Sequence, residues 1–177
     1  VCHLGNGSSL SAVVDGKCVD TSMGLTPLEG VLMGTRSGTL DPAVIEVLAT
    51  RENMTVTQVV DMLNKKSGLI GMSGRSSDMR DVVAGAKEGD ERCQITRELW
   101  AYVIRKHIGA YAAAMGGLDA LAFTAGIGEN DAPARAEICE GLEFLGVEID
   151  LEKNDGLREE GEISKDGARV KVWVVPT

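Results

Sequence analysis

The sequence is poor in aromatic residues and in basic ones. Phe, Trp and Tyr make up 3% of the 177 residues, so the core must be built from aliphatic side chains and methionine. The net charge is −9 at pH 7, and the acidic residues are spread along the chain. This excess disfavours nucleic acid as a partner. A phosphate-bearing ligand would need placed arginines, backbone N–H groups and a metal ion rather than a general positive field.

Paired cysteines and long apolar runs are also absent. Cys2, Cys18, Cys93 and Cys139 are too far apart in the sequence for a C-x-x-C pair or a zinc-ligand pattern. Reduced, mostly buried thiols are therefore favoured over a disulfide framework, which points to a cytoplasmic location. No apolar stretch approaches the ~20 residues needed to cross a bilayer, so no membrane partner is expected.

The chain has neither a start methionine nor a signal peptide. It opens at Val1 in the middle of an expected strand, and we interpret it as a fragment. Its length suits one compact domain that buries roughly two-thirds of the surface of the unfolded chain.

The first 22 residues predict a three-stranded meander. Gly5-Asn6-Gly7 marks its first turn, and apolar residues alternate from 10 to 14. Asp15-Gly16 between two β-like runs predicts the second turn. Residues 24–38 are too rich in glycine for a long helix and too apolar for a solvent loop, so we expect a packed, ordered loop.

Helices are expected in the middle of the chain. Asp41-Pro42 predicts a helix start by the N-cap and N1 preferences, and a second helix is expected from Thr55 to about Lys66. The polar run 76–81 could cap another helix, and residues 85–89 predict an exposed turn. From 90 to 115, apolar residues at three- and four-residue spacing predict a longer helix.

The last third predicts a strand, a glycine loop and a helix in succession. The strand is expected at 118–124, the loop at 125–131, and the helix runs on to Leu145. A loop of this kind, between a strand and a helix, often faces an anion or a nucleotide. Two further strands are expected at 146–150 and 170–175, joined by a polar loop.

Two common nucleotide motifs do not fit. Gly126-Ile127-Gly128 supplies the first two glycines of a G-x-G-x-x-G pattern, but Asp131 stands at the third. The loop 30–37 has three residues between its glycines instead of the four of a Walker A sequence. It also has Thr35-Arg36 where Gly-Lys should follow.

Three other pieces suit phosphate and adenosine. Gly5-Asn6-Gly7 lets the main chain approach a phosphate, although such turns more often only join strands. Arg36, in a glycine-flanked loop, could make bidentate contacts to a phosphoryl group or could be a surface arginine. Asp78 and Arg80 could direct a carboxylate at ribose hydroxyls and a guanidinium toward a base. Such a pair is more often a helix start.

Taken together, these segments resemble the acetate and propionate kinase family. The matches are His-Leu-Gly-Asn-Gly-Ser-Ser at 3–9, residues 19–30, residues 33–38, Asp41-Pro42, and Phe-Thr-Ala-Gly-Ile-Gly-Glu-Asn at 123–130. The resemblance implies an α/β, ribonuclease H-like (actin-like ATPase) domain, with a mixed sheet that opens with the meander and is flanked by helices. It also implies that 1–177 is the C-terminal nucleotide-binding domain of a two-domain acyl kinase, without its N-terminal domain and last C-terminal segment.

The resemblance assigns roles to particular residues. Pro27 would line the acyl pocket, and Arg36 would be the catalytic arginine that stabilises the transferring phosphoryl group. Ala125 stands where the family usually has glycine, an exchange that we expect to be tolerated if its φ is negative. The implied nucleotide-binding residues are His3, Gly5, Asn6, Gly7, Asp78, Met79, Arg80, Gly126, Ile127, Gly128, Asn130 and Arg135.

The implied activity is reversible, direct in-line phosphoryl transfer between ATP and acetate or propionate, giving ADP and an acyl phosphate. Mg²⁺ would accompany ATP or ADP, with protein ligands outside this chain, including a glutamate expected just after Thr177. A homodimer is implied as well. The isolated chain is expected to be inactive and to bind nucleotide weakly. The alternative is a non-catalytic nucleotide-binding module with a regulatory or dimerisation role.

Overall fold

The computed structural model describes residues 1–177, which form two compact units. Unit 1 consists of Val1–Ser22 and Ala101–Thr177, and unit 2 consists of Met23–Trp100. The long helix α5 (Glu91–Met115) contributes its first ten residues to unit 2 and the rest to unit 1. No helix of the chain is both long enough and apolar enough to span a membrane.

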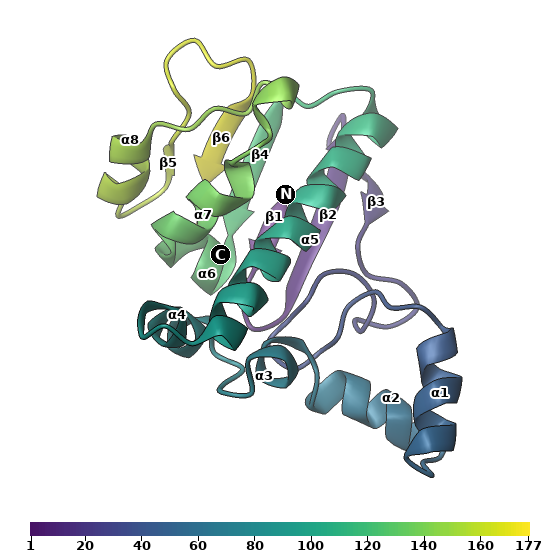
Figure 1. Cartoon of the computed structure of the whole chain (residues 1–177). Coiled ribbons are helices and arrows are strands. Elements are labelled where there is room, and N and C mark those ends of the chain that lie inside the picture. Colours follow the sequence, from purple (N-terminus) through teal and green to yellow (C-terminus); the bar gives the residue numbers. More distant parts are fainter. The chain divides into compact units, whose positions relative to one another are not determined.

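Unit 1 is built on a six-stranded mixed sheet (Figure 1). Strands β1, β4 and β6 are parallel, whereas β2, β3 and β5 run antiparallel to their neighbours. The meander and the mixed sheet with flanking helices are as predicted. The strand order is β3 (Lys17–Thr21), β2 (Ser8–Val14), β1 (Cys2–Leu4), β4 (Ala120–Thr124), β6 (Lys171–Val174) and β5 (Gly161–Glu162).

The β2–β3 hairpin turns at Asp15-Gly16, as the sequence predicts. Both residues have positive φ angles, 50° and 75°, which is the pair of conformations that a two-residue type I′ turn requires. The register shifts once, between Ala12 and Val13, where the ladder has an irregularity.

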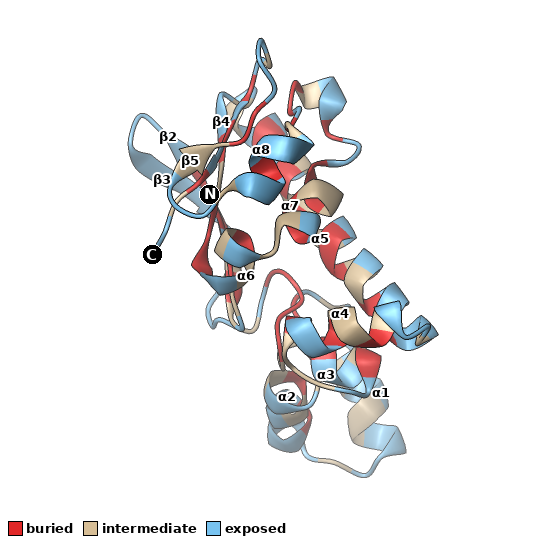
Figure 2. Cartoon of the chain, turned by 90° about the vertical axis from the view of Figure 1, so that its left-hand side faces the viewer, coloured by how far each residue is buried: buried red, intermediate tan, exposed pale blue.

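The core of unit 1 lies between the sheet and helices on one of its faces (Figure 2). Strand residues alternate in burial, so that Cys2 and Leu4 are buried on β1 while His3 between them is exposed. The Ala101–Met115 part of α5 presents a buried stripe at four-residue spacing, through Ile104 and Ile108. Aliphatic residues thus fill the core, as the shortage of aromatics requires.

The segment after β4 differs from the expected loop. Helix α6 (Ala125–Asn130) begins at once, and α7 (Ala132–Cys139) follows it. The helix expected to reach Leu145 ends six residues earlier, because Gly141 has a φ of 82°. The remainder is the short 3₁₀ helix η1 (Glu143–Leu145).

The strand expected at 146–150 is also not formed. Two isolated bridges join Val147 to Val170 and Ile149 to Ser164. The predicted polar loop contains a further helix, α8 (Leu151–Gly156), whose N-cap is Asp150. The last predicted strand is present as β6.

Unit 2 is helical. Its helices are α1 (Ala43–Arg51), α2 (Val56–Lys65), α3 (Gly68–Ser73), α4 (Met79–Lys87) and the first ten residues of α5. The predicted starts of α1, α2 and α4 are confirmed. Thr55 forms a capping box with Gln58, and Asp78 caps α4. The short helix α3 was not predicted.

The expected exposed turn at 85–89 is shorter than predicted. Residues up to Lys87 complete α4, and Gly85 is buried there. It packs so closely against Cys93 that an added Cβ would lie 2.6 Å from the Cys93 sulfur. The packed loop predicted at 24–38 is confirmed for 30–38, where Val31 and Met33 are fully buried. Residues 24–29 are mostly exposed instead, Leu25 completely so. Gly68 has a φ of 63°, and an added Cβ would meet the Met33 carbonyl oxygen at 2.1 Å, so only glycine fits against this loop.

Ala125 was expected to be tolerated in place of glycine if its φ angle were negative. The φ angle is 65°, so this expectation is wrong. A residue with a Cβ in this left-handed region is strained by about 1–2 kcal/mol. The residue is buried at the start of α6, and the surrounding packing holds it in this conformation.

We therefore expect Ala125→Gly to raise the free energy of unfolding by about 1 kcal/mol, because glycine adopts this conformation without strain. Thermal or chemical denaturation measures the change. The control is Ala110→Gly at an exposed position inside α5, which should lower stability by about 1 kcal/mol. A loss of stability in Ala125→Gly would contradict the assignment of strain.

Candidate functional site

Two glycine segments far apart in the sequence lie side by side. Strands β1 and β4 are parallel neighbours, with His3 paired to Thr124. The segments that follow the two strands therefore leave the sheet at the same end. A Cβ placed on Gly5 would lie 3.6 Å from that of Ala125. We call residues 5–7 and 125–130 together the glycine corner. In open α/β sheets, ligands bind at the carboxyl ends of parallel strands, which is where this corner lies.

The Gly5–Gly7 turn is held by its own polar groups. The Gly5 N–H donates to the Gly7 carbonyl at 3.1 Å, and the Ser8 hydroxyl donates to the Gly5 carbonyl at 3.0 Å. These bonds fix the turn and leave Asn6 exposed at its tip. His3, on the preceding strand, is exposed as well.

The two glycines of α6 have different surroundings. A Cβ added to Gly126 would meet nothing within 4 Å, so its main chain borders open space. Gly128 is buried, and an added Cβ would lie 3.4 Å from the Phe123 main chain. The Asn130 side chain donates to the Gly126 carbonyl at 2.9 Å, and Ile127 is half-buried. Gly126 is thus the member of α6 that is open to a ligand, whereas Gly128 serves packing.

Arg135 on α7 has only 2% of its surface exposed. Its guanidinium donates to the carbonyls of Gly128 and Glu129 at 2.9 and 2.8 Å, and to the side chain and carbonyl of Asn154 at 2.7 and 3.0 Å. Burial lowers the pKa of Arg135, and the carboxylates of Asp131 and Asp155 oppose that shift. The guanidinium is engaged by these protein acceptors, and the nucleotide contact of Arg135 stays a prediction.

A hollow of about 420 Å³ lies beside the glycine corner. Asn130 and Arg135 line it together with residues of α8 and of the segments that follow α8 and β6. At this side the Glu129 carboxylate accepts hydrogen bonds from the main chain and hydroxyl of Thr177, at 3.1 and 3.0 Å. The end of the chain is thereby attached to α6.

In unit 2, the packed loop brings Arg36 and Pro27 into contact. The Arg36 guanidinium donates to the Pro27 carbonyl at 3.3 Å and lies 3.5 Å from the Met33 sulfur, both of them neutral groups. The Thr35 hydroxyl anchors the loop to the Asn64 carbonyl at 2.8 Å. The two residues expected at the acyl and phosphoryl positions are therefore neighbours.

Asp78 and Arg80 form a helix start and a forked ion pair. The Asp78 carboxylate accepts the Arg80 main-chain N–H at 2.9 Å and the Arg80 guanidinium at 2.6–3.1 Å. These hydrogen bonds from Arg80 lower the pKa of Asp78. Met79 between them is 3% exposed, so its side chain packs in the core. The helix-start interpretation is confirmed, and the adenosine role remains a prediction.

The predicted site residues thus divide between the two units. Unit 1 holds His3, Gly5, Asn6, Gly7, Gly126, Ile127, Gly128, Asn130 and Arg135. Unit 2 holds Pro27, Arg36, Asp78, Met79 and Arg80.

Sequence reasoning missed Glu129 and Asn154. Asn154 is 1% exposed and lies in α8, a region expected to be a polar loop. Asp150 followed by Leu151 and Glu152 is an N-cap pattern that could have revealed the helix. No sequence signal indicated that Asn154 would meet Arg135.

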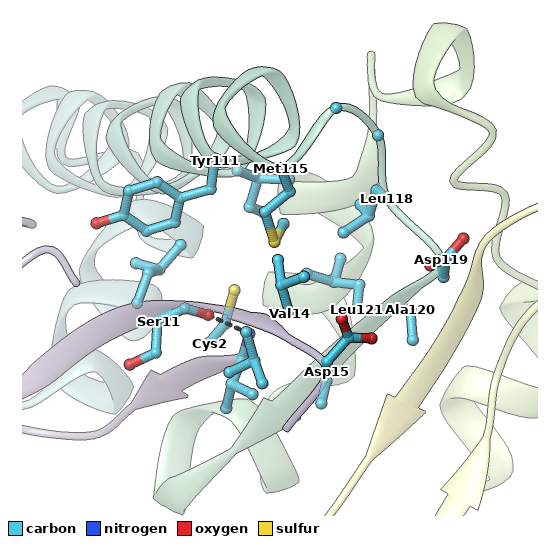
Figure 3. A pocket seen from close by; sticks show the side chains of 17 residues that line it. Cys2, Ser11, Val14, Asp15, Tyr111, Met115, Leu118, Asp119, Ala120 and Leu121 are labelled. Carbon is cyan, nitrogen blue, oxygen red and sulfur yellow. Dashed lines mark hydrogen bonds between the residues drawn. The ribbon is translucent and has the colours of Figure 1, made fainter. Parts of the chain in front are cut away.

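A second hollow, of about 430 Å³, lies where β1 and β4 begin, at the opposite end of these strands from the glycine corner (Figure 3). The end of α5 and the β2–β3 hairpin line it, with Tyr111 and Met115 pointing inward. None of the predicted site residues lines this hollow. Burial raises the pKa of its Cys2 thiol to about 12, so the thiol stays protonated and is a poor nucleophile.

Solved structures show which class of protein has this architecture. The crystal structure of acetate kinase from Porphyromonas gingivalis superimposes with a TM-score of 0.96 at 46% identity, over 99% of this chain and 44% of that one. A propionate kinase from Francisella tularensis superimposes with a TM-score of 0.93 at 43% identity, over 99% of this chain and 45% of that one. The chain thus has the ribonuclease H-like, actin-like fold.

Sequence comparison is more specific. The chain is 55% identical over 176 residues to an acetate kinase of Bacteroides fragilis, covering 99% of this chain and 44% of that relative. The model of the Acetokinase family matches residues 1–177, and the chain belongs to this family. It spans less than half the length of the curated relatives it matches.

We expect Asp78→Ala to lower the free energy of unfolding by about 1 kcal/mol at pH 7, because the N-cap acceptor of α4 is lost. The folded-state pKa of Asp78 is depressed, so its contribution is present above the ordinary carboxyl pKa. It is lost as the pH falls through the lower folded-state value. Urea denaturation at pH 7 and below pH 3 measures both values. The control, Asp78→Asn, should retain most of the cap, and equal losses in both variants would contradict the capping role.

Proposed function

We propose that the protein containing this chain catalyses reversible phosphoryl transfer between ATP and a short-chain carboxylate, giving ADP and an acyl phosphate. The observation that carries the proposal is the glycine corner, formed by parallel pairing of β1 and β4 in a chain of the Acetokinase family. Unit 1 would bind the nucleotide through this corner. Since the chain spans 44% of the Bacteroides fragilis relative, the remaining parts of the site would lie elsewhere in the protein.

The corner suits a nucleotide because main-chain groups are accessible there. Gly5 and Gly7 carry no side chain at the turn, and Asn6 is exposed between them. The open space above Gly126 leaves room for a flat or bulky group against the main chain. We therefore place the phosphates at the 5–7 turn and the adenosine against Gly126 and Ile127.

Arg36 would supply charge for the transferring group. A carboxylate is a poor nucleophile, so catalysis must come from alignment and from neutralising charge on the equatorial phosphoryl oxygens. The Arg36 guanidinium is paired with neutral acceptors, the Pro27 carbonyl and the Met33 sulfur. Its charge would then be available to a phosphoryl group beside the pocket that Pro27 lines.

We propose that the protein ligands of the expected Mg²⁺ lie outside this chain. No three His, Cys, Asp or Glu side chains gather closely enough to hold a metal ion. Mg²⁺ is commonly bound by one or two carboxylates together with substrate phosphates. The ligands for a nucleotide-bound Mg²⁺ would therefore come largely from ATP and from other parts of the protein.

The acyl substrate stays open between acetate and propionate, because Pro27 is a single wall of the pocket. A homodimer is supported by apolar residues left exposed in unit 2. Helix α1 has no buried residue, and Val47 on it and Val56 on α2 are 45% and 61% exposed. Apolar groups exposed in this way suit an interface.

Gly126→Val tests the nucleotide position. The new side chain enters open space and leaves the fold intact, so we expect at least a tenfold rise in the KM for ATP with a near-normal melting temperature. Steady-state kinetics on the full-length protein measures the effect. The matched control is Gly109→Val on α5, where an added Cβ also meets nothing within 4 Å. An unchanged KM for ATP in Gly126→Val would remove the adenosine from this position.

Arg36→Ala tests the catalytic charge. We expect kcat to fall by ~10³-fold, the scale of transition-state arginines, while the affinity for ADP changes little. An acyl-hydroxamate assay gives kcat, and calorimetry gives the ADP affinity. Lys17→Ala, at an exposed position of β3, is the control and should be active. Near-normal turnover of Arg36→Ala would exclude Arg36 from the mechanism.

A further inference from the structure

Arg135 is a buried cation that hydrogen-bonds no carboxylate in unit 1. Its four hydrogen-bond contacts at 2.7–3.0 Å go to main-chain carbonyls and to an amide oxygen. A buried charge is costly unless it is paired or fully hydrogen-bonded. The hydrogen bonds between the guanidinium and these acceptors must therefore offset the cost of burying the charge of Arg135.

The acceptors are the carboxyl-terminal ends of two short helices. The Gly128 and Glu129 carbonyls belong to the last turn of α6, and the Asn154 carbonyl to the last turn of α8. Such carbonyls have no partner inside their own helix and carry the negative end of its dipole. Helices of six residues are not stable alone. One planar guanidinium with five N–H groups meets both ends at once, which a lysine ammonium cannot do with the same geometry.

Asn154 completes the network. Its side-chain oxygen accepts from the Arg135 Nε, and its side-chain nitrogen donates to the Ala132 carbonyl at 2.8 Å. Ala132 is the first residue of α7, so the pair joins α6, α7 and α8. Both side chains are almost fully buried, and the network is therefore shielded from water.

The consequence concerns Gly126. Gly126 lies two residues before Gly128 on α6. Asn130, the last residue of this helix, donates a hydrogen bond from its side chain to the Gly126 carbonyl. A change in the Arg135 contacts at the end of α6 would move the main chain on which the nucleotide is proposed to lie. We propose that Arg135 is a positioning residue, which with Asn154 orients α6 for the nucleotide without contacting the nucleotide itself. This inference rests on the proposed nucleotide position.

The test uses Arg135→Lys and Asn154→Ala in the full-length protein. For both we expect the KM for ATP to rise at least fivefold, while the KM for the carboxylate stays within twofold. Hydrogen exchange without nucleotide should show faster exchange of residues 126–130. Asn154→Ala is the discriminating variant, because it leaves the Arg135 charge in place. If Arg135 bound the nucleotide directly, Asn154→Ala would leave the KM for ATP unchanged, and the proposal would be overturned.

A destabilising variant in the core distinguishes positioning of α6 from a general loss of stability. Leu10→Ala on β2, 2% exposed, should lower the melting temperature and leave the KM for ATP within twofold. An equal rise of that KM in Leu10→Ala, at the same loss of melting temperature, would overturn positioning. If Arg135→Lys does not fold, Asn154→Ala decides alone by the same readouts.

The Gly126→Val variant tests the proposed nucleotide position independently of the Arg135 and Asn154 variants. If Gly126→Val raises the KM for ATP and the Arg135 and Asn154 variants do not, the positioning proposal fails and the nucleotide position stands. If Gly126→Val has no effect, the nucleotide position fails, and the positioning proposal fails with it.

Discussion

The parallel pairing of β1 with β4 is the contact on which the candidate site depends. These strands are separated by more than a hundred residues, yet their pairing places Gly5 beside Ala125. Parallel strands end at the same edge of a sheet, so the turn after one and the helix after the other must meet. The aliphatic packing of the sheet against α5 and α7 supports that pairing, and a change in register would separate the two glycine segments.

Four of the nine residues of this corner are glycines, at 5, 7, 126 and 128. Glycines allow close approach, and the one residue with a Cβ at the junction, Ala125, is strained there at a φ of 65°. Next to the corner, the hydrogen bonds of Arg135 and Asn154 join the three short helices α6, α7 and α8. In the proposed function, an acidic protein would bind a polyanion here through main-chain N–H groups, without a broad positive field.

Unit 2 follows a different design, in which charged groups are held by a packed loop and a helix start. Arg36 contacts the Pro27 carbonyl, and Asp78 caps α4 while pairing with Arg80. Charge is placed by local hydrogen bonds in each case. In the proposed reaction, unit 1 would contribute main-chain contacts to the nucleotide and unit 2 the cation for the phosphoryl group.

Local signals were sufficient for much of the fold. The meander, the Asp15-Gly16 turn, the helix starts at Thr55 and Asp78 and the long α5 follow from turn chemistry, capping and periodicity. All of these act within a few residues. The errors came where local signals conflict with packing. Glycines at 125–131 suggested a loop where α6 forms, and the polar composition of 151–156 concealed α8.

The sequence by itself determined the family and the α/β class, because runs of glycine and polar residues in a set order are specific enough to be recognised without coordinates. Only the tertiary structure decided that Ala125 is strained, that the side chain of Met79 is buried and that Arg135 faces protein carbonyls. The physical reason is that backbone conformation, burial and hydrogen-bond partners at these positions are set by residues distant in the sequence. For Arg135 that partner is Asn154, nineteen residues further along the chain.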